Sequence, residues 1–110
     1  MPYDEDLANR LRELLADEDN ITEKKMFGGL AFLLNGHMSV SASGKGGLLV
    51  RVEPSDTEAL LERDHVERMV MGGRSMDGWL RVGPEAVRTK RQIEPWVKRS
   101  VRYVKTLPPK

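Results

Sequence analysis

The sequence predicts a small α+β domain. An antiparallel β-sheet of hairpin or meander type is expected, flanked by an N-terminal helix, a middle helix and a long C-terminal helix. Three observations predict this: amphipathic helical periodicity at each end of the chain, strand-like segments between these ends, and an Asn-Gly dipeptide that joins two of the segments. The 110 residues contain no evident linker, so a single domain spanning residues 1–110 is expected.

The first helix is predicted over Asp4 to Ala16. Its leucines recur at positions i, i+4, i+7 and i+8 and so form one apolar stripe, made of Leu7, Leu11, Leu14 and Leu15. The acidic residues of its first turn suit the positive end of the helix dipole. After a polar stop, Ile21 to Phe27 is expected to be an extended segment.

The strongest local signal is the hairpin of residues 30–34 and 37–42 around Asn35-Gly36. Asn-Gly supplies the two positive φ angles of a type I′ turn. A two-residue loop would pair Leu34 with His37, Leu33 with Met38, Phe32 with Ser39, Ala31 with Val40 and Leu30 with Ser41. Both faces would then be partly apolar, which predicts cover on each face, either from two helices or from one helix and a partner. The alternating Ser39, Ser41 and Ser43 are expected on the solvent side of the strand.

Residues 48–52 form the next predicted strand. A middle helix is expected from about Asp56 to Arg63, because Ser55 and Glu58 have capping-box spacing. Gly72-Gly73 and Asp77-Gly78 are expected to bracket a turn, followed by a short strand over residues 79–82.

The last helix is predicted over Lys90 to Thr106 on the spacing of its apolar residues, and Pro108-Pro109 ends it. Pro95 lies early in this segment. Either the regular helix begins near Glu94, or its first turns are kinked.

Charge is distributed unevenly along the chain. Residues 1–80 carry 9 Lys/Arg against 15 Asp/Glu, a net charge of −6, whereas residues 81–110 carry 9 against 2, a net charge of +7. Docking of the basic tail onto the chain's own acidic part or binding of an anionic partner would each explain this polarity.

Several functional classes are disfavoured by composition. The chain has no cysteine, which excludes disulfides and thiolate chemistry, and no long apolar segment or signal-like N-terminus, so we expect a cytoplasmic protein without membrane contact. The two histidines, His37 and His65, lack metal-ligand spacing, and residues 43–47 do not fit a phosphate-binding loop. We therefore predict no catalytic residue, no metal site and no cofactor.

The basic C-terminal helix carries the main candidate binding residues. On a helical projection Arg91, Lys98, Arg102 and Lys105 cluster opposite the apolar stripe. A solvated helix surface explains this cationic face most simply. The alternatives are contact with a nucleic-acid backbone or with an acidic protein surface.

Two motifs resemble a known family. Lys25-Met26-Phe27-Gly28-Gly29 and the later run Met71 to Trp79, with the hairpin between them and the closing residues 96–110, resemble the N-terminal domain of the TfoX/Sxy competence regulators. The motif residues, which we expect to be structural, are Met26, Phe27, Gly28, Gly29, Met76, Gly78 and Trp79. The glycines at 28 and 29 would allow close approach of backbones or a strand bulge.

The resemblance implies an α+β fold and a regulatory rather than catalytic role, because full-length members act as transcriptional co-activators alongside a cyclic-AMP receptor protein. Those members carry a second, C-terminal domain, whereas this chain ends at Lys110, so a stand-alone domain is expected. Arg74 is a further candidate partner-binding residue: it would clamp a partner's carboxylate or phosphate, or pair internally to hold its turn.

Three functional hypotheses follow. The first is a non-catalytic regulatory or adaptor domain that binds a protein or a protein–DNA assembly. The second is a small-molecule-binding protein or small enzyme with a pocket near Arg74 and Trp79. The third is a homodimer formed through the apolar second face of the sheet.

Overall fold

The computed structural model describes residues 3–26, 28–71 and 73–108, without the side chains of residues 71 and 74–76. In these described residues, three α-helices and six β-strands confirm the α+β class. The helices are α1 (Glu5–Leu14), α2 (Thr57–Leu61) and α3 (Lys90–Val104), and the short 3₁₀ turns are η1 (Pro54–Asp56) and η2 (Pro84–Ala86). The strands are β1 (Ile21–Met26), β2 (Gly29–Leu34), β3 (His37–Ala42), β4 (Leu48–Arg51), β5 (Val66–Met71) and β6 (Arg74–Val82).

The six strands form one antiparallel sheet in the order β1-β2-β3-β4-β6-β5. The order differs from a simple meander because β6 lies between β4 and β5. Strand β5 was not predicted, because its apolar residues do not alternate regularly along the sequence. Its pairing with β6 is correspondingly irregular, with a register shift between Arg68 and Val70. The Asp77-Gly78 step, predicted as one side of a turn, lies inside β6.

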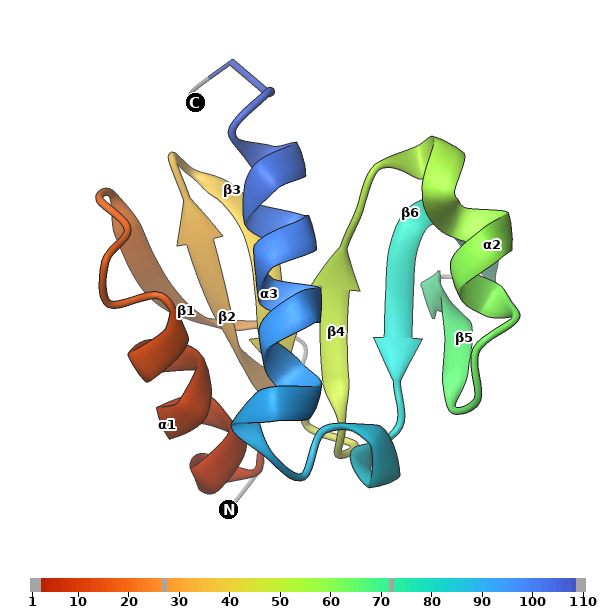
Figure 1. Ribbon diagram of the computed structural model, residues 1–110, viewed down its shortest axis with the longest axis horizontal. Coiled ribbons are helices and arrows are strands. Elements are labelled where there is room, and N and C mark those ends of the chain that lie inside the picture. The colour runs from red at the N-terminus through yellow and green to blue at the C-terminus, as the bar shows by residue number, and fades with distance from the viewer. Residues whose placement is uncertain (1–2, 27, 72, 109–110) are drawn as a thin grey trace.

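The main core lies between one face of the sheet and the helices. Figure 1 shows α1 and α3 on the same side of the sheet, with α3 running close to β3 and β4. Each helix contributes buried side chains to this core, among them Leu11 from α1, Leu60 from α2 and Ile93 from α3. Burial of such aliphatic groups is the main term that holds the helices on the sheet.

The other face of the sheet has a smaller apolar cluster. Ala31, Met38, Leu49 and Met69 are buried there, and Met26, Leu33 and Trp79 pack beside them. None of the described helical residues belongs to this cluster. The helices therefore cover one face, and the centre of the second face is buried by the strands' own side chains.

The predicted hairpin turn is confirmed, but the predicted register holds only next to it. Asn35 and Gly36 have φ angles of 53° and 85°, and Leu34 pairs with His37 as expected. A β-bulge at the third position then shifts the pairs, so that Phe32 lies opposite Val40 instead of Ser39. The remaining pairs are likewise Ala31 with Ser41 and Leu30 with Ala42.

The expectation that the serines face solvent is wrong, because Ser39, Ser41 and Ser43 are buried. Ser39 hydrogen-bonds to Ser100 of α3: the two hydroxyl oxygens are 2.7 Å apart, and the Ser100 hydroxyl donates to the Ser39 carbonyl at 2.9 Å. Since the Ser100 proton is used for the carbonyl, the Ser39 hydroxyl donates to Ser100 Oγ. This polar contact within the core fixes α3 against β3.

The start of α2 also differs from the prediction. Residues 54–56 form η1, and Asp56 caps α2 without a side-chain hydrogen bond, so the Ser55–Glu58 capping box is absent. The buried Thr57 hydroxyl instead accepts a hydrogen bond from the Gly78 amide at 2.7 Å. This contact ties the start of α2 to β6.

Helix α3 begins at Lys90, so Pro95 lies inside it and the alternative start near Glu94 is wrong. A capping box formed by Thr89 and Gln92 satisfies the first turn. The predicted close approach at Gly29 is confirmed, because an added Cβ would lie 2.2 Å from the Ala42 carbonyl oxygen. Phe27 lies outside the described residues.

Candidate binding surfaces on the C-terminal helix

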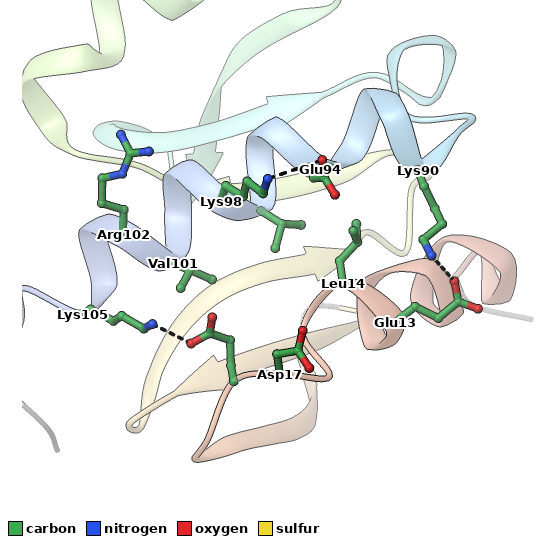
Figure 2. Close-up of a pocket in the computed structure, with 11 residues that line it drawn as sticks. Glu13, Leu14, Asp17, Lys90, Glu94, Lys98, Val101, Arg102 and Lys105 are labelled. Carbon is green, nitrogen blue, oxygen red and sulfur yellow. Dashed lines mark ion pairs between the residues drawn. The ribbon is translucent and has the colours of Figure 1, made fainter.

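Three of the predicted cationic residues line one groove. Lys98, Arg102 and Lys105 of α3 line the groove between α1 and α3, which has a volume of about 670 Å³ (Figure 2). Leu14, Val97 and Val101 provide its apolar surface. Arg91 is exposed near the start of α3 and is not among the groove residues.

Ion pairs neutralise much of the groove's charge. Lys105 Nζ lies 2.7 Å from Glu18 Oε1, and Lys90 Nζ lies 2.9 Å from Glu13 Oε2, so the basic helix is bound to the acidic N-terminal part of the chain (Figure 2). Lys98 Nζ lies 3.5 Å from Glu94 Oε1 within α3. Internal docking therefore accounts for much of the charge polarity seen in the sequence.

Arg102 differs from these lysines. Its guanidinium points away from α1 in Figure 2, and it also lines a second hollow on the other side of α3. Within the described parts of the chain, no carboxylate lies within 4.0 Å of Arg102. Arg102 therefore lines both hollows, one on each side of α3.

The second hollow lies between α3 and η1 and has a volume of about 520 Å³. Arg99 and Arg102 lie on its α3 wall with Tyr103 and Thr106, whereas Glu53 and Asp56 lie at η1. None of these four charged side chains has an ion pair among the described residues. Sequence reasoning missed Arg99, Glu53 and Asp56 as site residues. The two acids are far from α3 in the sequence, and only the fold brings them to it.

Arginine stacking on aromatic rings shapes this region. The guanidinium carbon of Arg99 lies 5.6 Å from the centre of the Trp96 ring, and that of Arg63 lies 5.5 Å from it. The Nη1 atom of Arg99 is buried and has no hydrogen-bond partner among the described residues. The Arg99 guanidinium is therefore in cation–π contact with Trp96, and its buried Nη1 is left without an acceptor among the described residues.

The predicted pocket near Arg74 and Trp79 gains no support from the described side chains. Trp79 is half-buried, and the guanidinium carbon of Arg51 lies 4.9 Å from the centre of its ring. The same carbon lies 5.8 Å from the centre of the Tyr103 ring. The side chains of Arg74 and Met76 lie outside the described residues.

The histidines have local partners. His37 Nε2 lies 2.6 Å from the carbonyl oxygen of Pro108, and His65 Nδ1 lies 3.1 Å from Glu85 Oε2. In residues 3–26, 28–71 and 73–108, no three His, Cys, Asp or Glu side chains gather as a metal site would require.

The ion pair between Arg12 and Glu23 shifts the pKa of both residues. Arg12 donates from Nε and Nη2 to the two carboxylate oxygens of Glu23, each at 2.8 Å, and so joins α1 to β1. These hydrogen bonds lower the pKa of Glu23 below its ordinary value and raise the pKa of Arg12. The pair anchors α1 to β1, the edge strand of the sheet.

The fold and the two hollows define a small α+β domain whose polar side chains gather in surface grooves beside its longest helix. The model of the TfoX N-terminal domain matches residues 13–104, and the chain belongs to this family. Comparison with curated proteins and with solved structures finds no significant match. None of the helices in the described parts of the chain is long and apolar enough to cross a bilayer.

Proposed function

We propose that this domain is a non-catalytic regulatory or adaptor domain that binds a protein, alone or within a protein–DNA assembly, through the groove between α1 and α3. Its family membership supports a competence-related regulatory role. The observation that carries the proposal is the form of the groove, in which an apolar floor lies between two charged rims. An amphipathic helix of a partner fits such a groove with its apolar side on the floor.

The charges of the groove define the partner further. The α1 rim is acidic, with Glu13, Asp17 and Glu18, and the α3 rim is mostly basic. Among the described residues, Asp17 and Arg102 are the charged rim residues without an ion pair, and a partner helix with a basic residue toward Asp17 and an acidic residue toward Arg102 complements them. A nucleic-acid backbone fits less well, because it would meet the acidic rim and because Lys98 and Lys105 already have carboxylate partners.

A non-catalytic role agrees with the chemistry of the groove. General acid–base catalysis needs a titratable group shielded from water and close to the reacting atoms. Glu13, Glu94 and Lys98 are each at least half exposed along their side chains and are held in ion pairs. Such groups suit recognition.

The test is affinity capture from the native cell extract with variants of the groove. Leu14→Glu places a charge on the floor, and Arg102→Glu reverses the unpaired rim cation. We expect a partner captured by the wild-type chain to be lost with Leu14→Glu, weakened with Arg102→Glu and retained after nuclease treatment. Lys24→Glu, an exposed change on β1, is the matched control and should retain it.

Melting curves by circular dichroism establish that each variant is folded. Equal capture by the wild type and Leu14→Glu would reject the groove as the binding surface. Release of every captured protein by nuclease would instead favour a nucleic-acid ligand.

A further inference from the structure

The hollow between η1 and α3 is lined by four charged groups that have no ion pair among the residues that the structure describes. Arg99 and Arg102 are three residues apart on α3 and so lie on the same side of the helix. Glu53 and Asp56 flank the opposite side at η1. Elsewhere on α3, the lysines Lys90, Lys98 and Lys105 each have a carboxylate within 4.0 Å.

The separation of these charges has a physical consequence. Opposite charges more than 4 Å apart across a solvent-filled gap attract weakly, because water screens them. A molecule that fills the gap and carries both signs of charge gains from each wall at once. Charge complementarity therefore specifies its chemistry.

Arg99 is prepared for such a ligand. The carbon of its guanidinium lies 5.6 Å from the centre of the Trp96 ring, and no carboxylate of the described residues lies within 4.0 Å of it. A guanidinium that contacts a ring and is not paired with an internal carboxylate can donate hydrogen bonds to the anionic group of a ligand. Two guanidinium groups can bind the same carboxylate.

We propose that this hollow binds a small zwitterion, with the chemistry of a free amino acid or a short peptide. Its carboxylate lies against Arg99 and Arg102, and its ammonium group lies against Glu53 and Asp56. Tyr103, backed by Arg51, supplies an aromatic surface for the carbon skeleton. A volume of about 520 Å³ falls within the usual range for small-ligand pockets.

Ligands with one sign of charge fit less well. A phosphate ion would be attracted by the arginines but repelled by Glu53 and Asp56, and a simple amine would meet the converse arrangement. The site is distinct from the groove proposed for a protein partner, although Arg102 lines each of them. Its test uses the purified chain alone and so does not depend on that partner.

The experiment is isothermal titration calorimetry of the purified chain with L-alanine and with trialanine. These probes carry their two charges at short and long separation, so their comparison shows whether the hollow takes a free amino acid or a peptide. We expect at least one of them to bind. N-acetylation, which removes the ammonium charge, and C-terminal amidation, which removes the carboxylate charge, should each weaken binding about tenfold or more.

Variants assign each charge to its wall. The double variant Glu53→Gln/Asp56→Asn should bind the zwitterion as weakly as the wild type binds the N-acetylated probe. N-acetylation of the probe should not weaken its binding to this variant any further. Arg102→Gln should reduce the effect of amidation, because only Arg99 then faces the carboxylate. Arg102 is exposed, so the fold should survive even where Arg99→Gln is unstable.

Lys98→Gln, which changes the groove and not the hollow, is the matched control and should bind the probe like the wild type. Absence of binding heat for L-alanine and for trialanine would overturn the proposal. Equal affinity for the N-acetylated, amidated and unmodified probes would overturn it as well, because binding would then not depend on the two charges.

Discussion

The two hollows beside α3 contain similar residues but use them differently. In the groove toward α1, Lys90 and Lys105 are paired with carboxylates of the N-terminal segment. In the hollow toward η1, Arg99 and Arg102 face Glu53 and Asp56, and none of the four has an ion pair within the described parts of the chain. Most charges on the α1 side of α3 are therefore held in ion pairs within the chain, whereas the charges on the η1 side have no such pairs among the described residues.

This difference follows from how closely the neighbouring elements approach α3. Helix α1 packs directly against α3, so lysine side chains of the one reach acids near the other. The η1 turn belongs to the half of the molecule that contains α2, β5 and β6, and a gap separates it from α3. The same pair of charge types becomes an ion pair or an open site according to that spacing.

The largest effect is expected from loosening α3, which forms a wall of each hollow. Ser100→Ala removes the hydroxyl that satisfies the carbonyl and the hydroxyl of Ser39 inside the core. Leaving these buried groups unpaired should lower the free energy of unfolding by about 1–3 kcal/mol, measured by urea denaturation. Ser55→Ala, at an exposed position, should change it by less than about 0.5 kcal/mol.

If Ser100→Ala proved as stable as Ser55→Ala, the serine contact would not fix α3. The position of the helix would then depend on apolar packing alone, through residues such as Ile93 and Val104. The distinction between the two hollows would rest on that packing.

A smaller effect should separate the two sides directly. Glu18→Gln breaks the ion pair with Lys105 and should lower the free energy of unfolding by up to about 1 kcal/mol, because the pair is partly exposed. Asp56→Asn, its counterpart in the hollow, should change it by less than about 0.5 kcal/mol. High salt should shrink the effect of Glu18→Gln, since mobile ions screen the pair.

The comparison would fail if Asp56→Asn destabilised the chain as much as Glu18→Gln does. The acids at η1 would then serve the fold, as those near α1 do. A binding role for the hollow would lose its physical basis.

How far the sequence predicted these features depends on the range of the interactions. The hairpin turn was predictable because Asn35 and Gly36 decide it by themselves. The register beyond it was not, because the bulge at Ser39 is stabilised by Ser100, which is 61 residues away. Helix α3 was predictable because periodicity and terminating prolines are local signals, but its start was left open between Lys90 and Glu94, and the structure places it at Lys90.

The binding surfaces show the same limit. The cationic face of α3 was visible in the sequence, since helical periodicity alone places Lys98, Arg102 and Lys105 together. Which of these cations remain unpaired was not, because that depends on where Glu18 and Glu13 lie in the folded chain. Glu53 and Asp56 had no local pattern that relates them to α3.

The smallest effect concerns pH and the anchoring of the paired side. Because Arg12 donates two hydrogen bonds to Glu23, the pKa of Glu23 is lower in the folded chain than in the unfolded one. The unfolded chain therefore takes up this proton first as pH falls. The contribution of the Arg12–Glu23 pair to stability is fully present above the ordinary pKa of glutamate, about 4.3. It is lost as pH falls through the lower pKa that Glu23 has in the folded state.

Glu23→Gln should therefore lower the melting temperature by a few degrees at most at neutral pH, because the pair is largely exposed, and by less in acid. Asp56→Asn should melt like the wild type at neutral pH, which would confine the ion-pair contribution to the α1 side of α3. A melting difference between Glu23→Gln and the wild type that persisted unchanged into strong acid would have another cause, such as altered packing of α1 on β1. Packing contacts would then hold α1 on the sheet. The ion pairs on the α1 side of α3 would contribute less to stability than their number indicates.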